Sequence, residues 1–298
     1  MRILVAYDGS AGAAQAVALA AGIDWPTGSM VRVVSVIDPT ALQLLPWTTG
    51  DAASRVLERD AIAYVEADQA TVVGRLSAPN RVVDAVLLRD RPASALVDQA
   101  GEFEADLVVV GSRGHGPIAS LLLGSVSTEV VDHAPCPVLV ARRSTLERVV
   151  FATDGSKTAA AAEDVLTRWP IFVGLPIRVV SVADVVRPWT TGIAPTMYTQ
   201  VLRAYAEDLA EAEAEHLAIA RGSAKRLAEA GRLADAEMRK GDAAAEILAV
   251  TQESGADLIV IGSRGQTGVR RIFLGSVARN VLAAGDASVL VVHRPAEA

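Results

Sequence analysis

Cysteine, lysine and long apolar runs are scarce in this chain of 298 residues, and each shortage excludes a class of protein. The lone thiol, Cys136, has no second cysteine with which to form an intramolecular disulfide, so we expect it to be a structural residue. Only three of the 28 basic residues are lysine, no basic run occurs and the net charge is −7. A nucleic-acid partner is therefore not expected.

Apolar runs long enough to cross a membrane are also absent from the sequence. The apolar stretch near the first residues is too short for a signal peptide, so we expect a cytoplasmic protein. What the sequence does have is apolar material in shorter pieces. It is 51% hydrophobic and 21% charged, which is enough to build buried sheets.

A glycine-rich motif that occurs twice is the most informative feature that is present. It reads Gly-Ser-Arg-Gly, nine residues, then Gly-Ser, and it spans residues 111–125 and 262–276 without an insertion. Each copy follows a short, β-branched apolar run, at 107–110 and 258–261. Such a run is typical of a parallel strand that is buried on both faces.

The repetition extends over the rest of the chain. The segment 32–36 returns unchanged at 178–182, and the segment 46–50 returns unchanged at 188–192. A period of this length indicates a duplicated domain rather than a solenoid. We therefore expect two domains, over residues 1–143 and 147–298, and the short polar link between them favours close packing of the halves.

Each half alternates apolar strands with helical segments. Strands are expected near 2–7, 31–37, 82–88, 106–110 and 137–142, and again near 148–153, 177–183, 234–239, 257–261 and 288–293. Helices are expected near 10–23, with Ser10 as N-cap, and near 51–76, 92–101, 124–133 and 197–230. Strict alternation predicts an α/β fold with a parallel sheet, right-handed crossovers and helices on both faces. Ligands of such sheets bind beyond the carboxyl ends of the strands.

The loop itself predicts an anion site made of backbone amides. It lacks the lysine of a P-loop and the spacing and position of a dinucleotide fingerprint. Gly111 and Gly114 would let a ligand approach closely, while Gly124 and Ser125 would begin a helix whose amides and dipole favour phosphate. If the glycines only formed tight turns, their spacing would be expected to drift between the copies. The matching residues of the second copy are Gly262, Gly265, Gly275 and Ser276.

An aspartate and a glycine follow the first strand of each half, as Asp8-Gly9 and Asp154-Gly155. In a parallel sheet they lie at the same edge as the glycine loop. A carboxylate there can accept hydrogen bonds from ribose hydroxyls or help to hold a divalent cation. The alternative is that the aspartate caps the following helix.

Two further matched pairs lie near these positions. Val36 and Val182 end the second strands, where their backbone could read the edge of an adenine ring. Arg113 and Arg264 lie inside the loops, where each could neutralise phosphate or simply face solvent.

Three other features are weaker. His115 has Gln266 as its counterpart, so a shared catalytic role is not expected for it. The loops that contain Trp47 and Trp189 could form lids, contacts between domains or plain core caps.

Taken together, these residues resemble the universal stress protein family, and in particular its tandem bacterial members. The resemblance rests on Asp8-Gly9-Ser10, the segment 35–38, the Gly-x-x-Gly-x9-Gly-Ser motif and the closing segment 136–140, and it covers essentially the whole chain. In the second half, Asp286-Ala287-Ser288 replaces Pro-Cys-Pro before the last strand, which leaves the turn there open.

The resemblance implies a fold and a ligand. The fold is two tandem Rossmann-like domains of the adenine nucleotide alpha hydrolase type, each a five-stranded parallel sheet of order 3-2-1-4-5. The ligand is ATP in each half, bound by the matched aspartates, valines, glycines and serines, and Mg²⁺ could accompany it. The last strand often forms dimers in this family, so the two halves could pair in that way, and a homodimer of the whole chain is a further option.

Two functions remain open from the sequence. The first is a nucleotide-dependent regulatory protein without a catalytic residue, and the second is a weak ATPase or phosphotransfer enzyme that uses the same sites. Phosphoryl transfer needs metal clamps, a positioned nucleophile and cationic charge. The loop offers amides, a serine and one arginine, which favours binding, although slow hydrolysis is compatible with it.

Overall fold

The computed structural model describes residues 1–40, 51–114, 123–184, 195–265 and 274–293. The first half contains β1 (Arg2–Ala6), α1 (Ala11–Gly22), β2 (Ser29–Ile37), α3 (Asp51–Leu76), β3 (Arg81–Arg89), α4 (Pro92–Glu102), β4 (Leu107–Gly111), α5 (Ser125–His133) and β5 (Val138–Ala141). The second half contains β6 (Val149–Ala152), α6 (Lys157–Arg168), the short 3-10 helix η1 (Pro170–Phe172), β7 (Pro176–Ala183), α7 (Pro195–Glu229), β8 (Leu233–Lys240), α8 (Ala243–Ser254), β9 (Leu258–Gly262), α9 (Ser276–Ala284) and β10 (Ser288–Val292).

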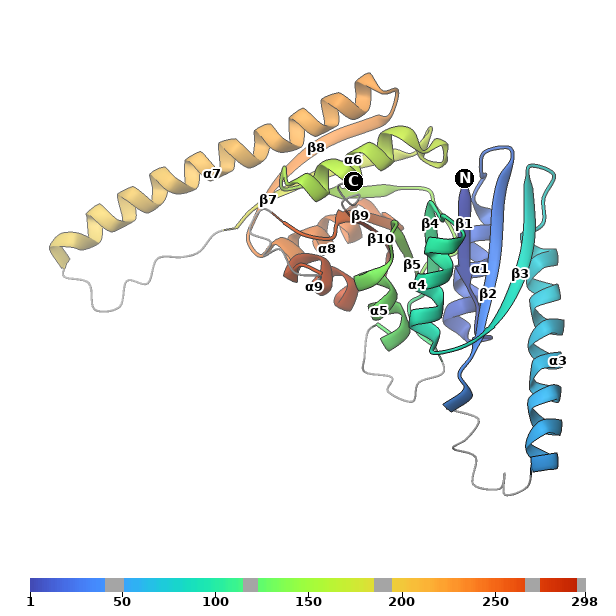
Figure 1. Cartoon of the computed structure of the whole chain (residues 1–298). Coiled ribbons are helices and arrows are strands. Elements are labelled where there is room, and N and C mark those ends of the chain that lie inside the picture. Colours follow the sequence, from blue (N-terminus) through green and yellow to red (C-terminus); the bar gives the residue numbers. More distant parts are fainter. Residues whose placement is uncertain (41–50, 115–122, 185–194, 266–273, 294–298) are drawn as a thin grey trace.

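The strands form one continuous ten-stranded sheet with the order β3-β2-β1-β4-β5-β10-β9-β6-β7-β8 (Figure 1). Within each half all neighbours are parallel, and the order is the one that the family resemblance implies. The halves meet at β5 and β10, which pair antiparallel. The expected α/β fold is therefore confirmed, and its two five-stranded sheets are fused edge to edge.

The buried position of the central strands explains why their sequences are apolar. Every residue of β5, β6, β9 and β10 is buried, because helices cover both faces and other strands cover both edges. Uninterrupted β-branched runs satisfy that environment. The outermost strands β3 and β8 contain exposed positions, which accounts for their charged residues.

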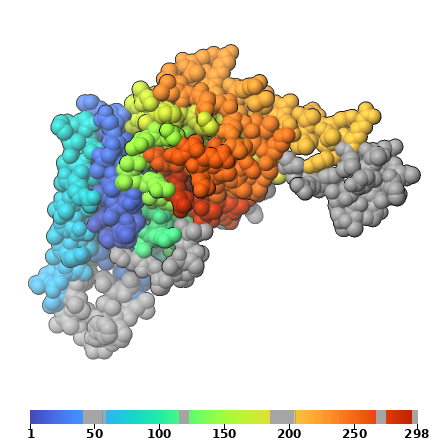
Figure 2. Space-filling model, turned by 180° about the vertical axis from the view of Figure 1, so that it is seen from behind, coloured from blue at the N-terminus to red at the C-terminus, as the bar shows by residue number. Residues whose placement is uncertain are grey.

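Two apolar clusters lie on opposite faces of the sheet, and each runs through both halves. On one face, α1, α3, α6 and α7 pack over the sheet around Trp25, Phe151 and Phe172, which are almost fully buried. On the other face lie α4, α5, α8 and α9. Figure 2 shows one continuous body, beyond which the first turns of α7 extend.

Paired side chains lock the junction between the halves. Val140, Leu139 and Val138 lie opposite Val289, Leu290 and Val291. One residue after each strand, a cationic or titratable side chain reaches into the other half. The Arg142 guanidinium donates to the carbonyl of Leu282 in α9, and His293 Nε2 lies 2.7 Å from the carbonyl of Val131 in α5.

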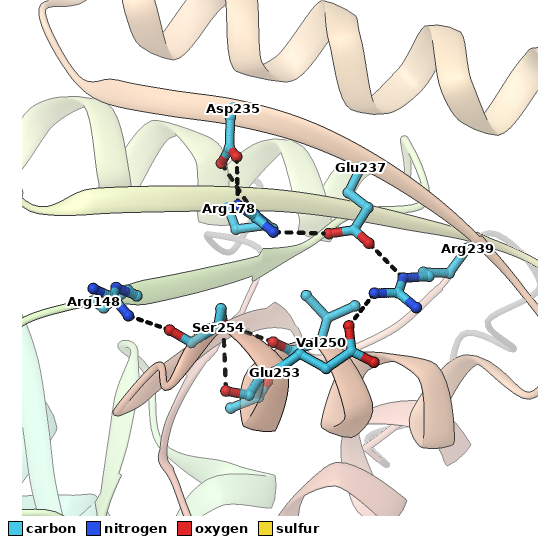
Figure 3. Close-up of polar contacts among 9 residues, drawn as sticks. Arg148, Arg178, Asp235, Glu237, Arg239, Val250, Glu253 and Ser254 are labelled. Atoms are coloured by element: carbon cyan, nitrogen blue, oxygen red, sulfur yellow. Dashed lines mark hydrogen bonds and ion pairs between the residues drawn. The ribbon is translucent and has the colours of Figure 1, made fainter.

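The outer strand of the second half carries a network of ion pairs (Figure 3) that the described residues of the first half do not repeat. Arg178 of β7 pairs with Asp235 at 2.8 Å and with Glu237 at 3.2 Å, both on β8. Arg239 then joins Glu237 to Glu253 of α8. In the first half the Arg32–Asp84 pair remains, but Val86 and Leu88 occupy the register positions of Glu237 and Arg239. The duplicated scaffold therefore carries different outer surfaces.

The single cysteine is buried in the core of the first half. Burial raises the pKa of the Cys136 thiol to about 12, so the reactive thiolate is scarce at neutral pH. This environment agrees with the expected structural role. Among the described residues, no helix combines the length and the apolar character needed to cross a membrane.

His293 predicts a pH dependence of stability. Burial lowers its pKa, and Arg264 acts in the same direction, while Asp132 and the backbone of Val131 and Cys136 oppose it. The unfolded chain then binds the proton more readily, so the free energy of unfolding should fall as the pH drops below about 6.5. His293→Gln keeps a donor for the Val131 carbonyl and should flatten this dependence, as measured by urea unfolding between pH 5 and 8.

His133 supplies the control, because its side chain is exposed at the end of α5. The pH dependence of unfolding should be flatter in His293→Gln than in His133→Gln. An unchanged profile in His293→Gln would contradict the assignment to the buried imidazole.

Candidate functional site

The structure brings the glycine loop and the first-strand aspartate together in both halves. β1 lies beside β4, and β6 lies beside β9, so the carboxyl ends of these strands share an edge. A Cβ added to Gly114 would stand 2.9 Å from Oδ2 of Asp8, and one added to Gly265 would stand 2.9 Å from Oδ2 of Asp154. The predicted aspartate and the glycine loop therefore border one space, and the geometry is the same in both halves.

The aspartates do not cap the helices that follow them. Asp8 Oδ1 accepts from the N–H of Ser10 at 3.0 Å and so closes the turn, in which Gly9 has a φ of +78°. Ser10 is the N-cap of α1, as expected, because its hydroxyl accepts from the N–H of Ala13 at 3.1 Å. The second half repeats the arrangement with Asp154, Gly155 and Ser156.

The first glycine of each loop is explained by packing alone. A Cβ on Gly111 would stand 2.4 Å from the carbonyl carbon of Gly12, at the start of α1. A Cβ on Gly262 would stand 2.6 Å from the Thr158 hydroxyl, in the first turn of α6. Here the structural alternative accounts for the residue without a ligand.

The last glycine of each loop has no such explanation. A Cβ on Gly124 would have its nearest neighbour at 3.7 Å, an ordinary contact, and its φ of −68° suits any residue. Gly275 is similar, with 3.4 Å and a φ of −63°. Among the described residues, neither packing nor backbone conformation requires glycine here, in contrast to Gly111 and Gly262.

One amide of the expected cradle is already engaged. The N–H of Gly124 donates to the carbonyl of Ser112 at 2.9 Å, and the N–H of Gly275 donates to Ser263 at 2.8 Å. The donors open to an anion therefore begin at Ser125 and Ser276, the exposed first residues of α5 and α9. Neither helix has an acidic residue in its first turn, so no fixed charge there repels phosphate.

The arginines and valines also lie at this edge. Arg113 is exposed and Arg264 is half-buried, and neither forms an ion pair with another described residue. Val36 is partly buried at the end of β2 and lies opposite Leu88 of β3. Val182 is its counterpart in β7, but its register partner is Arg239 of β8.

The sequence comparison of the halves missed one cation at the second site. Arg279 is exposed near the start of α9, where the first half has Thr128 in α5. A cation near a helix N-terminus opposes the helix dipole unless an anion lies close by. The signal was present in the sequence as a basic residue in the first turn of this helix, at the position where the first half has threonine.

The side chains beside the first and second strands differ between the two halves. The Tyr7 hydroxyl donates to Asp68 of α3 at 2.8 Å, and burial with this contact raises the pKa of Tyr7 to about 12. Thr153 stands in its place in the second half. There the Ser181 hydroxyl lies 2.8 Å from Nδ1 of His216 in α7. His115, Gln266, Trp47 and Trp189 lie outside the described residues.

No group of three or more His, Cys, Asp or Glu side chains gathers as a metal site within the part of the chain that the structure describes. Each site combines a carboxylate that faces a glycine loop with a helix N-terminus that has no acidic residue in its first turn. Such an arrangement can hold a ribose and a phosphate chain.

Comparison with known proteins gives a consistent family. The sequence model of the universal stress protein family matches residues 1–142 and, a second time, residues 145–293. A universal stress protein of Thermus aquaticus, from the QAH/OAS sulfhydrylase 3' region, is 41% identical over 140 residues, which cover 47% of this chain and 97% of that protein. A universal stress protein of Mycolicibacterium smegmatis is 28% identical over 307 residues, which cover 98% of this chain and 96% of that one.

A solved structure shows the same fold over the whole chain. The universal stress protein from Archaeoglobus fulgidus aligns with a TM-score of 0.64 and 19% identity, over 98% of each chain. The similarity at this level concerns the architecture alone.

The contrast between the glycines predicts losses of stability of different size for the same substitution. Gly111→Ala should lower the free energy of unfolding by about 1–3 kcal/mol or more, because its Cβ meets backbone. Gly124→Ala should cost less than about 1 kcal/mol, the scale of an N-cap change. Urea unfolding of the two variants checks this, and equal losses would show that the packing argument is wrong.

Proposed function

The chain belongs to the universal stress protein family, with two tandem domains, and on that basis we propose that each half binds one molecule of ATP. The observation that carries the proposal is the approach of Gly114 to Asp8 and of Gly265 to Asp154. Both halves leave room beside a carboxylate where any side chain would intrude. The residues therefore fit a nucleotide that lies across the edge of the sheet.

The two ends of the ligand have distinct donors and acceptors in this proposal. Asp8 and Asp154 accept from the ribose hydroxyls, while Val36 and Val182 lie near the adenine ring. Ser125 and Ser276 offer a hydroxyl and a first-turn amide to the phosphates. Arg113 and Arg264 supply positive charge, and Arg279 adds more at the second site.

We propose binding rather than catalysis as the main activity. Each site places acceptors at the nucleoside and amides at the phosphates, a set that holds a ligand in its ground state. To accelerate ATP hydrolysis, a site requires groups that interact more strongly with the transition state than with bound ATP, such as a positioned base or a metal clamp. Mg²⁺ could bridge the phosphates and the aspartate when ATP is bound, and the alternative of slow hydrolysis uses the same residues.

The tandem arrangement has a consequence for assembly. β5 and β10 pair with each other, so the last strands of this chain are already occupied. A homodimer would use a different surface, and we propose the single chain with its paired halves as the functional unit in the cytoplasm.

Calorimetry tests the number of sites. ATP titrated into the purified full chain with Mg²⁺ should bind at two sites per chain. Gly114→Glu and Gly265→Glu each place bulk and negative charge beside an aspartate, so each should remove one site. The double variant should bind no ATP.

Gly101→Glu is a matched control, because Gly101 lies in α4 with open space where a Cβ would stand. It should bind ATP at two sites. If the double variant kept wild-type affinity, the loop assignment would be wrong. A turnover of ATP in the wild type well above that of the double variant would favour the enzymatic alternative.

A further inference from the structure

One residue of the first half reaches into the glycine loop of the second. Asp132 lies near the end of α5, and its Oδ1 accepts a hydrogen bond of 3.3 Å from the N–H of Leu274. Leu274 directly precedes Gly275, the N-cap of α9. The contact joins residues 142 positions apart and crosses the junction between the halves.

This bond completes the support for the end of the loop. Gly275 is tied to the start of the same loop, because its N–H donates to the carbonyl of Ser263 at 2.8 Å. The preceding amide, that of Leu274, is tied to Asp132 of the other half. The start of α9, where the phosphates would lie, is thus oriented by one contact from each half.

Among the described residues, no counterpart of this bond supports the first site. The two helices α5 and α9 have nine residues each and align from Ser125 and Ser276. In this alignment Val131 matches Leu282, and Asp132 matches Ala283. A methyl group cannot accept a hydrogen bond, so Ala283 cannot hold Leu123 as Asp132 holds Leu274.

The surroundings of Asp132 link both ends of the second loop. His293, one residue beyond β10, bonds the neighbouring Val131 carbonyl at 2.7 Å. The charges of Asp132 and of Arg264 both act on this imidazole, in opposite directions. Arg264 lies at the beginning of the loop and acts on His293 through its charge, while Leu274 at the end of the loop bonds Asp132 directly.

We propose that Asp132 is a positioning residue for the second nucleotide site, supplied by the first half. It holds Leu274 so that the first amides of α9 face the phosphates, and the second site is complete only when the halves are docked. The inference rests on the proposed function, since it assumes that the site binds ATP. It also makes the two sites unequal.

The carboxylate has a second, opposing effect. Its negative charge repels phosphate weakly across solvent, whereas its oxygen holds the Leu274 amide. Two substitutions separate these effects. Asp132→Ala removes both the acceptor and the charge, while Asp132→Asn removes the charge and keeps an acceptor for Leu274. Glu129→Gln is the control, because it removes an exposed charge from the same helix.

Hydrogen exchange of the full chain without nucleotide tests the positioning directly. Asp132→Ala should speed exchange of the Leu274 amide by about three- to tenfold, the scale of one hydrogen bond. Asp132→Asn should stay close to the wild type, and Glu129→Gln should match it. Global unfolding in urea shows whether any change is local.

Calorimetry with ATP tests the consequence for binding. In the Gly114→Glu background only the second site is measured, and Asp132→Ala should raise its Kd by about three- to tenfold. In the Gly265→Glu background only the first site is measured, and its Kd should be unchanged. Asp132→Asn should restore most of the affinity at the second site.

The outcomes separate the two proposals. Wild-type exchange at Leu274 in Asp132→Ala, or a second-site Kd equal to that of Glu129→Gln, overturns the role of Asp132. A failure of the wild-type chain to bind ATP overturns the proposed function instead, and the exchange result then still reports whether Asp132 orders the loop.

Discussion

The antiparallel pairing of β5 with β10 is the contact on which the rest of this molecule depends. It turns two half-sheets into one sheet and buries the last strand of each half along both edges. The apolar clusters on the two faces then extend through both halves. Without this pairing, each half would expose an edge strand made almost entirely of apolar residues, which is a template for aggregation.

The same pairing determines which residues can contact the opposite half. It places the ends of α5 and α9 beside the junction, where Arg142 and His293 bond the helix carbonyls of the opposite half. A duplicated chain starts with two equal copies of such contacts. Here they have diverged, because one is a permanent cation and the other a buried imidazole with a lowered pKa. The halves also differ at Asp132 and its counterpart Ala283, because only the aspartate can accept a hydrogen bond from the loop of the opposite half.

Much of the fold could be predicted from the sequence because burial on both faces leaves a plain signature. The runs at 107–110 and 258–261 are strands for that reason, and the internal repeat fixed the alignment of the halves. The site was predicted as a set of residues, and the structure brings Asp8 to Gly114 and Asp154 to Gly265. The ATP ligand and the roles of these residues stay predictions.

Other properties needed coordinates. Gly111 and Gly124 look alike in the sequence, yet one is explained by the backbone of Gly12 and the other is not. The engaged amide of Gly124 depends on the path of the loop. The contact of Asp132 with Leu274 joins positions that no local pattern connects. Contacts of this kind between distant segments depend on packing. They cannot be predicted from the pattern of a single sequence.

The central claim is that each half holds one adenine nucleotide at the edge of the sheet. Native mass spectrometry of the purified full chain, incubated with ATP and Mg²⁺, tests it most directly because it counts bound ligands. The account predicts that the most abundant species carries two ATP molecules per chain. A chain that remains free of nucleotide at saturating ATP would contradict it.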